Sequence, residues 1–265
     1  MVDGAHRDAS RADGAGSPVT GFLASVASVQ EAGVVLAAGV DVVDLKAPAQ
    51  GILGALPVAV VREAVGFVAG RRTVSAATGD LPPYPAIVRE AVRVVRAAGA
   101  DIVKVGLFGP ARRREVLRAL GEEARAGTMI VVVLFADREA DLTRDLAEIA
   151  RQGLHGVMLD TCDKAGRGLR ACRRDEALSR FVLVARGLGL LAGLAGSLRA
   201  ADIGPLLALL PDYLGFRGAL CGDRGREGGI DPGAVLDIRT RIPVHRSTMT
   251  AGRNNVVEAY HELAG

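Results

Sequence analysis

The sequence predicts an α/β protein, a single (β/α)8 TIM barrel with flexible N- and C-terminal extensions. Two observations support this fold class. Eight short β-rich runs alternate with alanine- and arginine-rich stretches of helical period, at roughly 27 residues per unit. The length of 265 residues also suits one such barrel, which commonly needs about 250 residues.

The expected strands are apolar almost throughout, which is typical of parallel strands that are buried on both faces. In chain order they are FLASVAS (22–28), VDVVDLK (40–46), TVSAA (73–77), DIVKVGL (101–107), MIVVVLF (129–135), HGVMLD (155–160), GLLAGLA (189–195) and DYLGFRG (212–218). The segments expected to form helices lie at 29–39, 57–70, 84–98, 111–126, 139–152, 172–187, 199–210 and 233–240. A doubly wound sheet is the alternative, but the first turn lacks the G-x-G-x-x-G of its dinucleotide-binding form.

We expect one catalytic domain over residues 21–241, flanked by two extensions. Residues 1–20 mix both charge signs without an apolar central region, so we expect a disordered tail and no export signal. Residues 242–265 are expected to be a C-terminal extension whose order the sequence does not define. Since no apolar run approaches the roughly 20 residues that cross a bilayer, a cytoplasmic protein with no membrane partner is predicted.

Charge and cysteine usage argue against several classes of partner. The 33 basic side chains nearly balance the 30 acidic ones and have no clustered aromatic residues, so no nucleic-acid partner is predicted. Cys162, Cys172 and Cys221 stand at spacings that match no metal-ligand pattern and are expected to be reduced thiols. The sequence therefore predicts neither a disulfide, nor a metal site, nor a cofactor.

Lysine is the informative residue type in this chain. Only Lys46, Lys104 and Lys164 are lysine among the 33 basic residues, so the other 30 are arginine. A guanidinium stays charged in proteins, whereas an amine can lose its proton. A chain that uses arginine almost everywhere else is expected to keep lysine where loss of a proton is needed, so these three residues are candidate catalytic groups.

Four charged side chains are predicted to meet at one end of the barrel. The segments AAGVDVVDLKAP, AAGADIVKVGLFGP and GLHGVMLDT share a helix-Gly-strand plan. Counted from that glycine, Asp44 and Lys104 stand at the fifth place, and Lys46 and Asp160 at the seventh. Equal parity puts all four on one side, at the carboxyl ends of the strands where barrel enzymes build their active sites. Lys164 follows Asp160 in the loop above the same strand.

Lysines grouped in this way indicate Schiff-base chemistry. Burial beside other amines lowers the pKa of an amine, and a neutral amine attacks a carbonyl carbon. Asp44 and Asp160 would carry protons between carbinolamine, water and substrate. Buried ion pairs with the lysines are the alternative role for the aspartates, and a snorkelling side chain is the alternative for any one lysine.

The last two expected strands are followed by glycine-rich turns, LAGSL and FRGALCGDRGREGG. In many barrels these loops bind phosphate through backbone N–H groups. Gly196, Ser197, Arg217 and Gly218 are the candidate phosphate-binding residues, with ordinary turn chemistry as the alternative.

Other polar residues are expected to be structural. Asp41 and Asp101 fall near strand starts, at the opposite face of the barrel, where stability is the usual role. His155 also stands at a strand start. None of the three is a candidate for the site.

The motifs DVVDLKAPAQGILGA, VSAATGD, DIVKVGLFG, MLDT-x-x-K and FRGALC together resemble the (5-formylfuran-3-yl)methyl phosphate synthase family, over roughly residues 22–240. The resemblance implies a barrel enzyme without a cofactor that condenses two molecules of glyceraldehyde 3-phosphate, with loss of phosphate and water. Its product would be a phosphorylated hydroxymethyl furaldehyde for methanofuran-type cofactors. It also implies Lys46 as the Schiff-base lysine and Asp44 as its proton-transfer neighbour. The remaining catalytic set would be Lys104, Asp160 and Lys164.

One departure from the family pattern leaves the phosphate contacts open. The segment RGALCGDRGREGGID carries arginines but no lysine where an archaeal relative is expected to have one. The alternative enzyme function is that of another Schiff-base phosphosugar aldolase, which would release no phosphate. Outside enzymes, the rival is a barrel that only binds a phosphorylated ligand. The expected partners are a small-molecule phosphosugar and, in a homo-oligomer, further copies of the chain.

Overall fold

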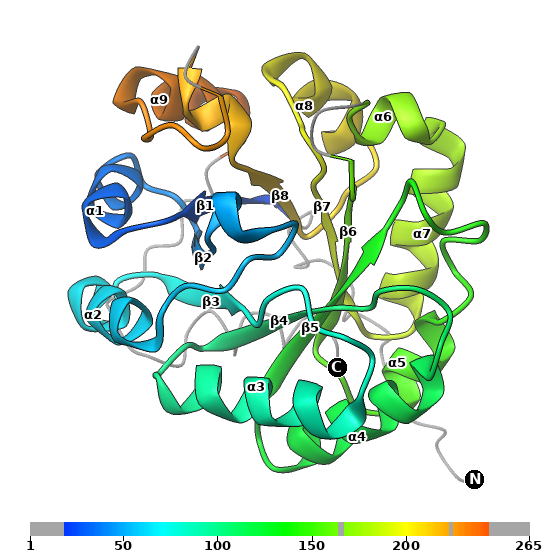
Figure 1. The fold of residues 1–265 in the computed structure, drawn as a ribbon. Helices are drawn as coiled ribbons and strands as arrows, with labels where there is room; N and C mark the ends of the chain where they lie inside the picture. The colour runs from blue at the N-terminus through cyan, green and yellow to red at the C-terminus, as the bar shows by residue number, and fades with distance from the viewer. Residues whose placement is uncertain (1–18, 164–166, 223–224, 244–265) are drawn as a thin grey trace, which may run out of the picture.

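Eight parallel strands close into one barrel in chain order, as the ribbon in Figure 1 shows. The computed structural model describes residues 19–163, 167–222 and 225–243. The strands are β1 (Gly21–Val26), β2 (Val42–Leu45), β3 (Thr73–Ala77), β4 (Ile102–Gly106), β5 (Met129–Phe135), β6 (Gly156–Asp160), β7 (Leu191–Leu194) and β8 (Tyr213–Phe216). The predicted barrel is thereby confirmed and the doubly wound sheet excluded, since β1 pairs with β8.

Helices surround the barrel on its outside (Figure 1). They are α1 (Val29–Ala37), α2 (Val58–Val68), α3 (Pro85–Ala97), α4 (Arg113–Arg125), α5 (Leu146–Arg151), α6 (Leu169–Cys172), α7 (Asp175–Gly187), α8 (Ala200–Leu207) and α9 (Pro232–Arg241), with 3-10 turns η1 (Pro48–Gln50) and η2 (Gly218–Leu220). Side chains start two of them: Ser28 Oγ accepts the N–H of Glu31 in α1, and Asp231 accepts the N–H of Ala234 in α9. None of the helices in the described residues could span a membrane.

The helix predicted at 139–152 is shorter in the structure. It begins only at Leu146, because Asp141 accepts both the backbone N–H and the hydroxyl of Thr143. This local turn competes with helix formation. The carboxylates of Glu139 and Asp145 each lie 2.7 Å from the guanidinium of Arg113. These two ion pairs fix the turn against the start of α4.

Two apolar layers lie on either side of the strand ring. The outer layer packs strands against helices and includes Val43 and Leu45. The inner layer fills the barrel and includes Val42, Met158 and Tyr213. Because β2 alternates between the two layers, Asp44 faces inward, as parity predicted.

Three aspartates at the amino ends of strands hold neighbouring strands together. Each stands just before a strand and accepts a backbone N–H from the strand before it. The bonds are Phe22 N to Asp41 Oδ2 (2.7 Å), Val74 N to Asp101 Oδ2 (2.8 Å) and Ala192 N to Asp212 Oδ2 (2.7 Å). The structural role expected for Asp41 and Asp101 is thus seen in both cases.

The two predicted extensions fall almost wholly outside the described residues. Of residues 1–20, the structure describes 19 and 20; of residues 242–265, it describes 242 and 243. The order of both extensions stays a prediction.

Candidate active site

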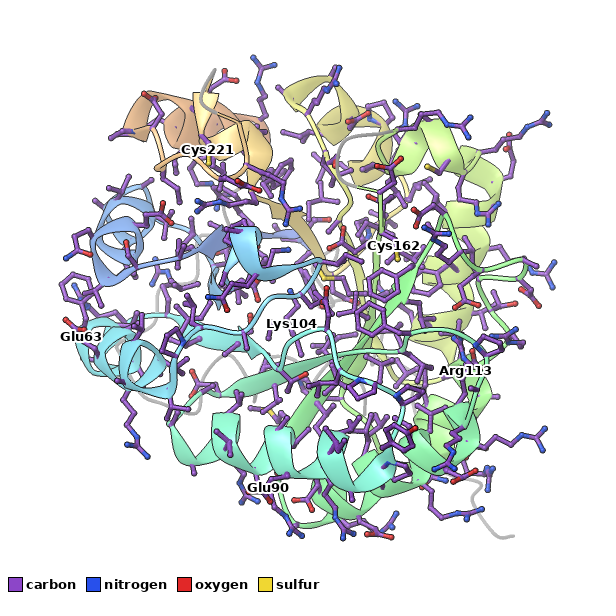
Figure 2. All side chains as sticks on the ribbon, viewed as in Figure 1. Glu63, Glu90, Lys104, Arg113, Cys162 and Cys221 are labelled. Atoms are coloured by element: carbon purple, nitrogen blue, oxygen red, sulfur yellow. The ribbon has the colours of Figure 1, made fainter. Side chains whose placement is uncertain are left out.

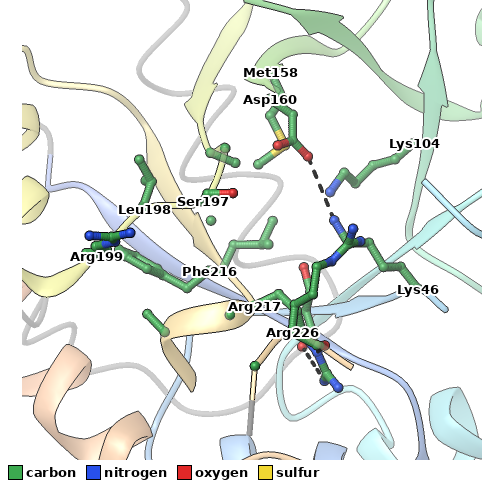
Figure 3. Close-up of a pocket in the computed structure, with 18 residues that line it drawn as sticks. Lys46, Lys104, Met158, Asp160, Ser197, Leu198, Arg199, Phe216, Arg217 and Arg226 are labelled. Atoms are coloured by element: carbon green, nitrogen blue, oxygen red, sulfur yellow. Dashed lines mark hydrogen bonds and ion pairs between the residues drawn. The ribbon is translucent and has the colours of Figure 1, made fainter. Parts of the chain in front are cut away.

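A pocket of about 260 Å³ opens at the carboxyl ends of the strands. Inward side chains of the strands line it, together with the loops after β7 and β8. Leu23 and Met158 give it apolar walls, while Lys46, Lys104 and Asp160 supply charge. Figure 2 shows Lys104 inside the ring of strands, and Figure 3 shows Lys46, Lys104 and Asp160 directed into one space.

Asp44 and Lys104 form a buried ion pair on the floor of this region. The Nζ of Lys104 lies 3.0 Å from each carboxylate oxygen of Asp44. The carboxylate also accepts the hydroxyls of Ser25 and Ser75, at 2.7 and 2.6 Å. Asp44 itself is fully buried. Burial alone would raise the pKa of Asp44, but the charges of Lys104 and Lys46 and the two hydroxyls hold that pKa below its ordinary value.

Lys46, just past the end of β2, and Asp160 of β6 form the second pair. The Lys46 Nζ lies 3.8 Å from Asp160 Oδ2, and both side chains are buried. The other oxygen of Asp160 accepts the backbone N–H of Thr161 at 2.8 Å, which fixes the plane of the carboxylate. Both charged groups line the pocket, so a ligand there meets an amine and a carboxylate together.

The loop that carries Lys46 is tied to its neighbour by one carboxylate. Asp80, in the loop after β3, accepts the backbone N–H groups of Ile52 and Leu53, both at 2.7 Å. Gly51, at φ +130°, lies so close that a Cβ there would stand 2.3 Å from Asp80. Position 51 therefore requires glycine. The bonds from Ile52 and Leu53 to Asp80 hold the loop in place.

The loop that leads to Lys164 is anchored in a similar way. Asp137 accepts the backbone N–H groups of Cys162 and Asp163 at 2.8 and 2.9 Å. Burial alone would raise the pKa of Asp137, but the backbone N–H donors of Asp163 and Cys162 hold it below its ordinary value. Lys164 lies outside the described residues, so its place in the site stays a prediction.

All four candidate phosphate-binding residues line the pocket. Gly196 adopts φ +107°, and a Cβ there would lie 2.9 Å from the Thr161 side chain, so only glycine fits. Ser197 follows at φ +49°. Gly218 lines the same pocket.

Arg217 also lines the pocket, but its guanidinium donates all of its hydrogen bonds to oxygen atoms of the protein. Nε donates to Arg226 O; Nη1 donates to Ser25 O and Glu31 Oε2; Nη2 donates to Glu31 Oε1 and Gly228 O. A guanidinium has five N–H bonds, and these contacts use all five. Phosphate binding by Arg217 stays a prediction; in this structure its guanidinium holds the loop after β8 against Glu31 of α1.

Arg226 is a pocket residue that sequence reasoning missed. It stands in the loop braced by Arg217, and its Nη2 donates to Gly51 O at 3.3 Å. Burial lowers its pKa, and the carboxylate of Asp160 opposes that shift most strongly. Because the chain has 30 arginines, nothing in the sequence marks Arg226 as a site residue. Only the fold shows that its contacts differ from those of Arg217.

Ser25 and Ser75 were also missed, although a signal existed. Both are polar residues inside strands that are otherwise apolar, and both share the inward parity of Asp44. Their meeting on one carboxylate depends on strand register, which places Ser25 beside Asp44 and Asp44 beside Ser75. The sequence does not specify that register.

Within the described residues, no group of three or more His, Cys, Asp and Glu side chains could hold a metal ion. Cys162, Cys172 and Cys221 form no disulfide there. Among the described residues, the polar side chains of the site are amines, carboxylates, hydroxyls and the guanidinium groups of Arg199, Arg217 and Arg226.

A closed (β/α)8 barrel with charged groups gathered at the carboxyl ends of its strands is the architecture of barrel enzymes. The 4-HFC-P synthase family model matches residues 22–239, and the chain belongs to this family. A protein of Methylorubrum extorquens is 40% identical over 216 residues, which cover 81% of this chain and 88% of that protein. The (5-formylfuran-3-yl)methyl phosphate synthase of Methanopyrus kandleri is 36% identical over 217 residues, covering 77% and 92%.

Solved structures support the fold. A 3-hexulose-6-phosphate synthase superposes with a TM-score of 0.61 at 19% identity, covering 84% of this chain and all of that one. A phosphoribosyl anthranilate isomerase from Thermus thermophilus gives 0.60 at 15% identity, covering 83% and 97%. At these identities the likeness shows the barrel alone.

Proposed function

We propose that the protein is a (5-formylfuran-3-yl)methyl phosphate synthase that works through a lysine Schiff base. Two molecules of glyceraldehyde 3-phosphate condense to the furan phosphate, with release of one phosphate and of water. The product would enter methanofuran-type cofactor biosynthesis. The observation that carries the proposal is the position of the Lys46 amine in the pocket, 3.8 Å from the Asp160 carboxylate, in a chain of this family.

The geometry favours Lys46 over Lys104 as the nucleophile. Lys104 holds both oxygens of Asp44 at 3.0 Å, so attack on a carbonyl would break a buried, charge-assisted pair. The Lys46 Nζ lies 3.8 Å from Asp160 Oδ2 and lines the pocket, so its attack on a substrate carbonyl would disturb no pair as short as that of Lys104 with Asp44. Lys104 then remains a fixed cation beside the imine.

Asp160 is suited to move protons in this sequence. A carbinolamine hydroxyl lies two bonds from the Lys46 Nζ, so a carboxylate 3.8 Å from that nitrogen can reach it. Protonation of the hydroxyl releases water and forms the imine. The same carboxylate can then take a proton from the carbon beside the imine, whose positive charge accepts the electron pair.

Asp160→Asn tests this role. We expect furan formation to fall about 10²-fold or more in the folded variant, because the amide keeps the shape of the side chain but cannot accept a proton. The measurement is steady-state furan absorbance. Asp231→Asn, the same isosteric change at the cap of α9 outside the pocket, is the control. A rate within a few-fold of the parent would leave Asp160 with a structural role.

The substrate phosphate is proposed to lie between the backbone of Gly196, Ser197 and Gly218 and the guanidinium of Arg226. These residues line one pocket with Lys46. The backbone supplies N–H donors and Arg226 supplies charge, the combination that phosphate sites use. Arg226 takes this role in place of Arg217, whose donors are occupied.

Arg226→Gln tests the assignment. We expect kcat/KM for glyceraldehyde 3-phosphate to fall about 10- to 100-fold, mainly through KM, since a charge-assisted hydrogen bond is lost. Unphosphorylated glyceraldehyde is the matched control substrate. Its rate of borohydride-trapped imine formation should be the same in both proteins. An equal loss with both aldehydes would show that Arg226 does not contact phosphate.

The function itself is tested with glyceraldehyde 3-phosphate, with and without borohydride. Inorganic phosphate, furan absorbance and the peptide that carries any reduced adduct are followed together. An adduct on Lys46 with equal amounts of phosphate and furan is expected. An adduct without phosphate release would make the protein a Schiff-base aldolase, and binding without any adduct would make it a ligand-binding barrel.

A further inference from the structure

Two serines hold the Asp44 carboxylate from both sides. The strand register sets Ser25 of β1 beside Asp44 and Asp44 beside Ser75 of β3. The Ser25 hydroxyl donates to Oδ2 at 2.7 Å and the Ser75 hydroxyl to Oδ1 at 2.6 Å. All three side chains are buried, so water does not compete for these bonds.

The Asp44 carboxylate has no acceptor site to spare. Each oxygen accepts one hydroxyl and the Lys104 Nζ, and a carboxylate has about four lone-pair sites. Asp44 also lies beneath the pocket rather than on its lining. A saturated carboxylate out of reach of the substrate is poorly placed to carry protons and well placed to hold a cation.

We propose that Ser25 and Ser75 are positioning residues of the active site, which act through Asp44 on Lys104. The two hydroxyls fix the carboxylate plane so that both oxygens face Nζ. Two N–H bonds of Lys104 are then directed at Asp44, and the third is left for a ligand in the pocket that Lys104 lines. This inference rests on the proposed function for its effect on turnover.

The charged groups around the carboxylate define the expected pH dependence. Lys104 of β4 and Lys46, just past β2, face Asp44, and Asp160 of β6 faces Lys46. The serine hydroxyls are among the groups that hold the pKa of Asp44 below its ordinary value. Removal of either hydroxyl raises this pKa, so activity that needs the ionised carboxylate is lost at a higher pH than in the parent.

The experiment compares Ser25→Ala, Ser75→Ala and the double variant with the parent. We expect each single change to lower kcat about ten-fold, with KM little changed, and to move the acid limb of the kcat profile to higher pH. Ser75→Thr keeps a hydroxyl and should restore most of the rate. Thr78→Val is the matched control, because its buried hydroxyl donates to the backbone oxygen of Lys104 at 3.2 Å and not to Asp44.

A second readout separates this inference from the proposed function. The Asp44 carboxyl is titrated by ¹³C NMR, with Asp44→Asn for assignment and thermal unfolding as a check of the fold. A raised Asp44 pKa in both serine variants supports the positioning role of Ser25 and Ser75. If the parent forms no furan, the proposed function is overturned, but this result for the serines still holds. The inference would be overturned if the Asp44 pKa in the serine variants equalled that of the parent. It would also be overturned if their kcat and pH profile equalled those of Thr78→Val.

Discussion

Lys46→Arg is expected to abolish furan formation, by about 10³-fold or more, while the barrel stays folded. Arginine keeps the positive charge beside Asp160 but cannot lose its proton to become a nucleophile. No imine can then form at this position, and every later step depends on it. Furan absorbance, phosphate release and mass spectrometry after borohydride treatment measure the loss, and thermal unfolding checks the fold.

Lys104→Arg is the matched variant for this experiment. It makes the same change of side chain in the same pocket, at the lysine whose proposed role is that of a cation. We expect the adduct on Lys46 to persist in Lys104→Arg and to vanish in Lys46→Arg. An adduct that survives in Lys46→Arg would move the nucleophile to Lys104 or Lys164.

Asp44→Ala is expected to have the largest effect on stability, about 3–5 kcal/mol at pH 7. The change leaves the Lys104 ammonium buried without its counter-ion, and an uncompensated buried charge costs free energy of this order. Urea unfolding of parent and variant at pH 7 measures the difference. The double variant Asp44→Ala, Lys104→Met removes both charges and should recover much of the loss.

The pH dependence of this destabilisation has a defined sign. The pKa of Asp44 is lowered in the folded protein from 3.8, so its ionisation stabilises the fold above that pH. This contribution is lost as the pH falls through the lower, folded pKa, where the parent also carries a neutral side chain. The difference in free energy of unfolding between the parent and Asp44→Ala should therefore be largest near neutral pH and become smaller only in strong acid. A double variant no more stable than Asp44→Ala would contradict the ion-pair account.

Much of the fold followed from sequence periodicity. Eight apolar runs separated by amphipathic segments are enough to predict a closed parallel barrel, because such strands need cover on both faces. Parity within a strand also placed Asp44, Lys46, Lys104 and Asp160 on the inner side, since that alternation is a local property of the backbone. Distances between strands are not local, so the sequence offered ion pairs between these groups as an alternative but did not show that Lys104 pairs with Asp44 and Lys46 with Asp160.

The different contacts of two arginines in the site have a physical cause. Arg217 and Arg226 stand nine positions apart in one glycine-rich loop, and their side chains are chemically identical. Both line the pocket, but only Arg217 bonds to Glu31, which lies in α1 and is brought close by closure of the barrel. The catalytic roles, the place of Lys164, the order of the extensions, homo-oligomeric assembly and cytoplasmic location stay predictions.

The aspartates at the amino ends of the strands divide the barrel into pairs. Their bonds join β1 to β2, β3 to β4 and β7 to β8, while His155 stands at the corresponding place before β6. A circular permutant opened in the turn at 69–72, between α2 and β3, would keep every such bond inside a continuous pair. One opened at 38–41 would send Phe22 and Asp41 to opposite ends of the chain. Three of the four consecutive strand pairs are thus each held at their amino ends by a carboxylate of the same pair.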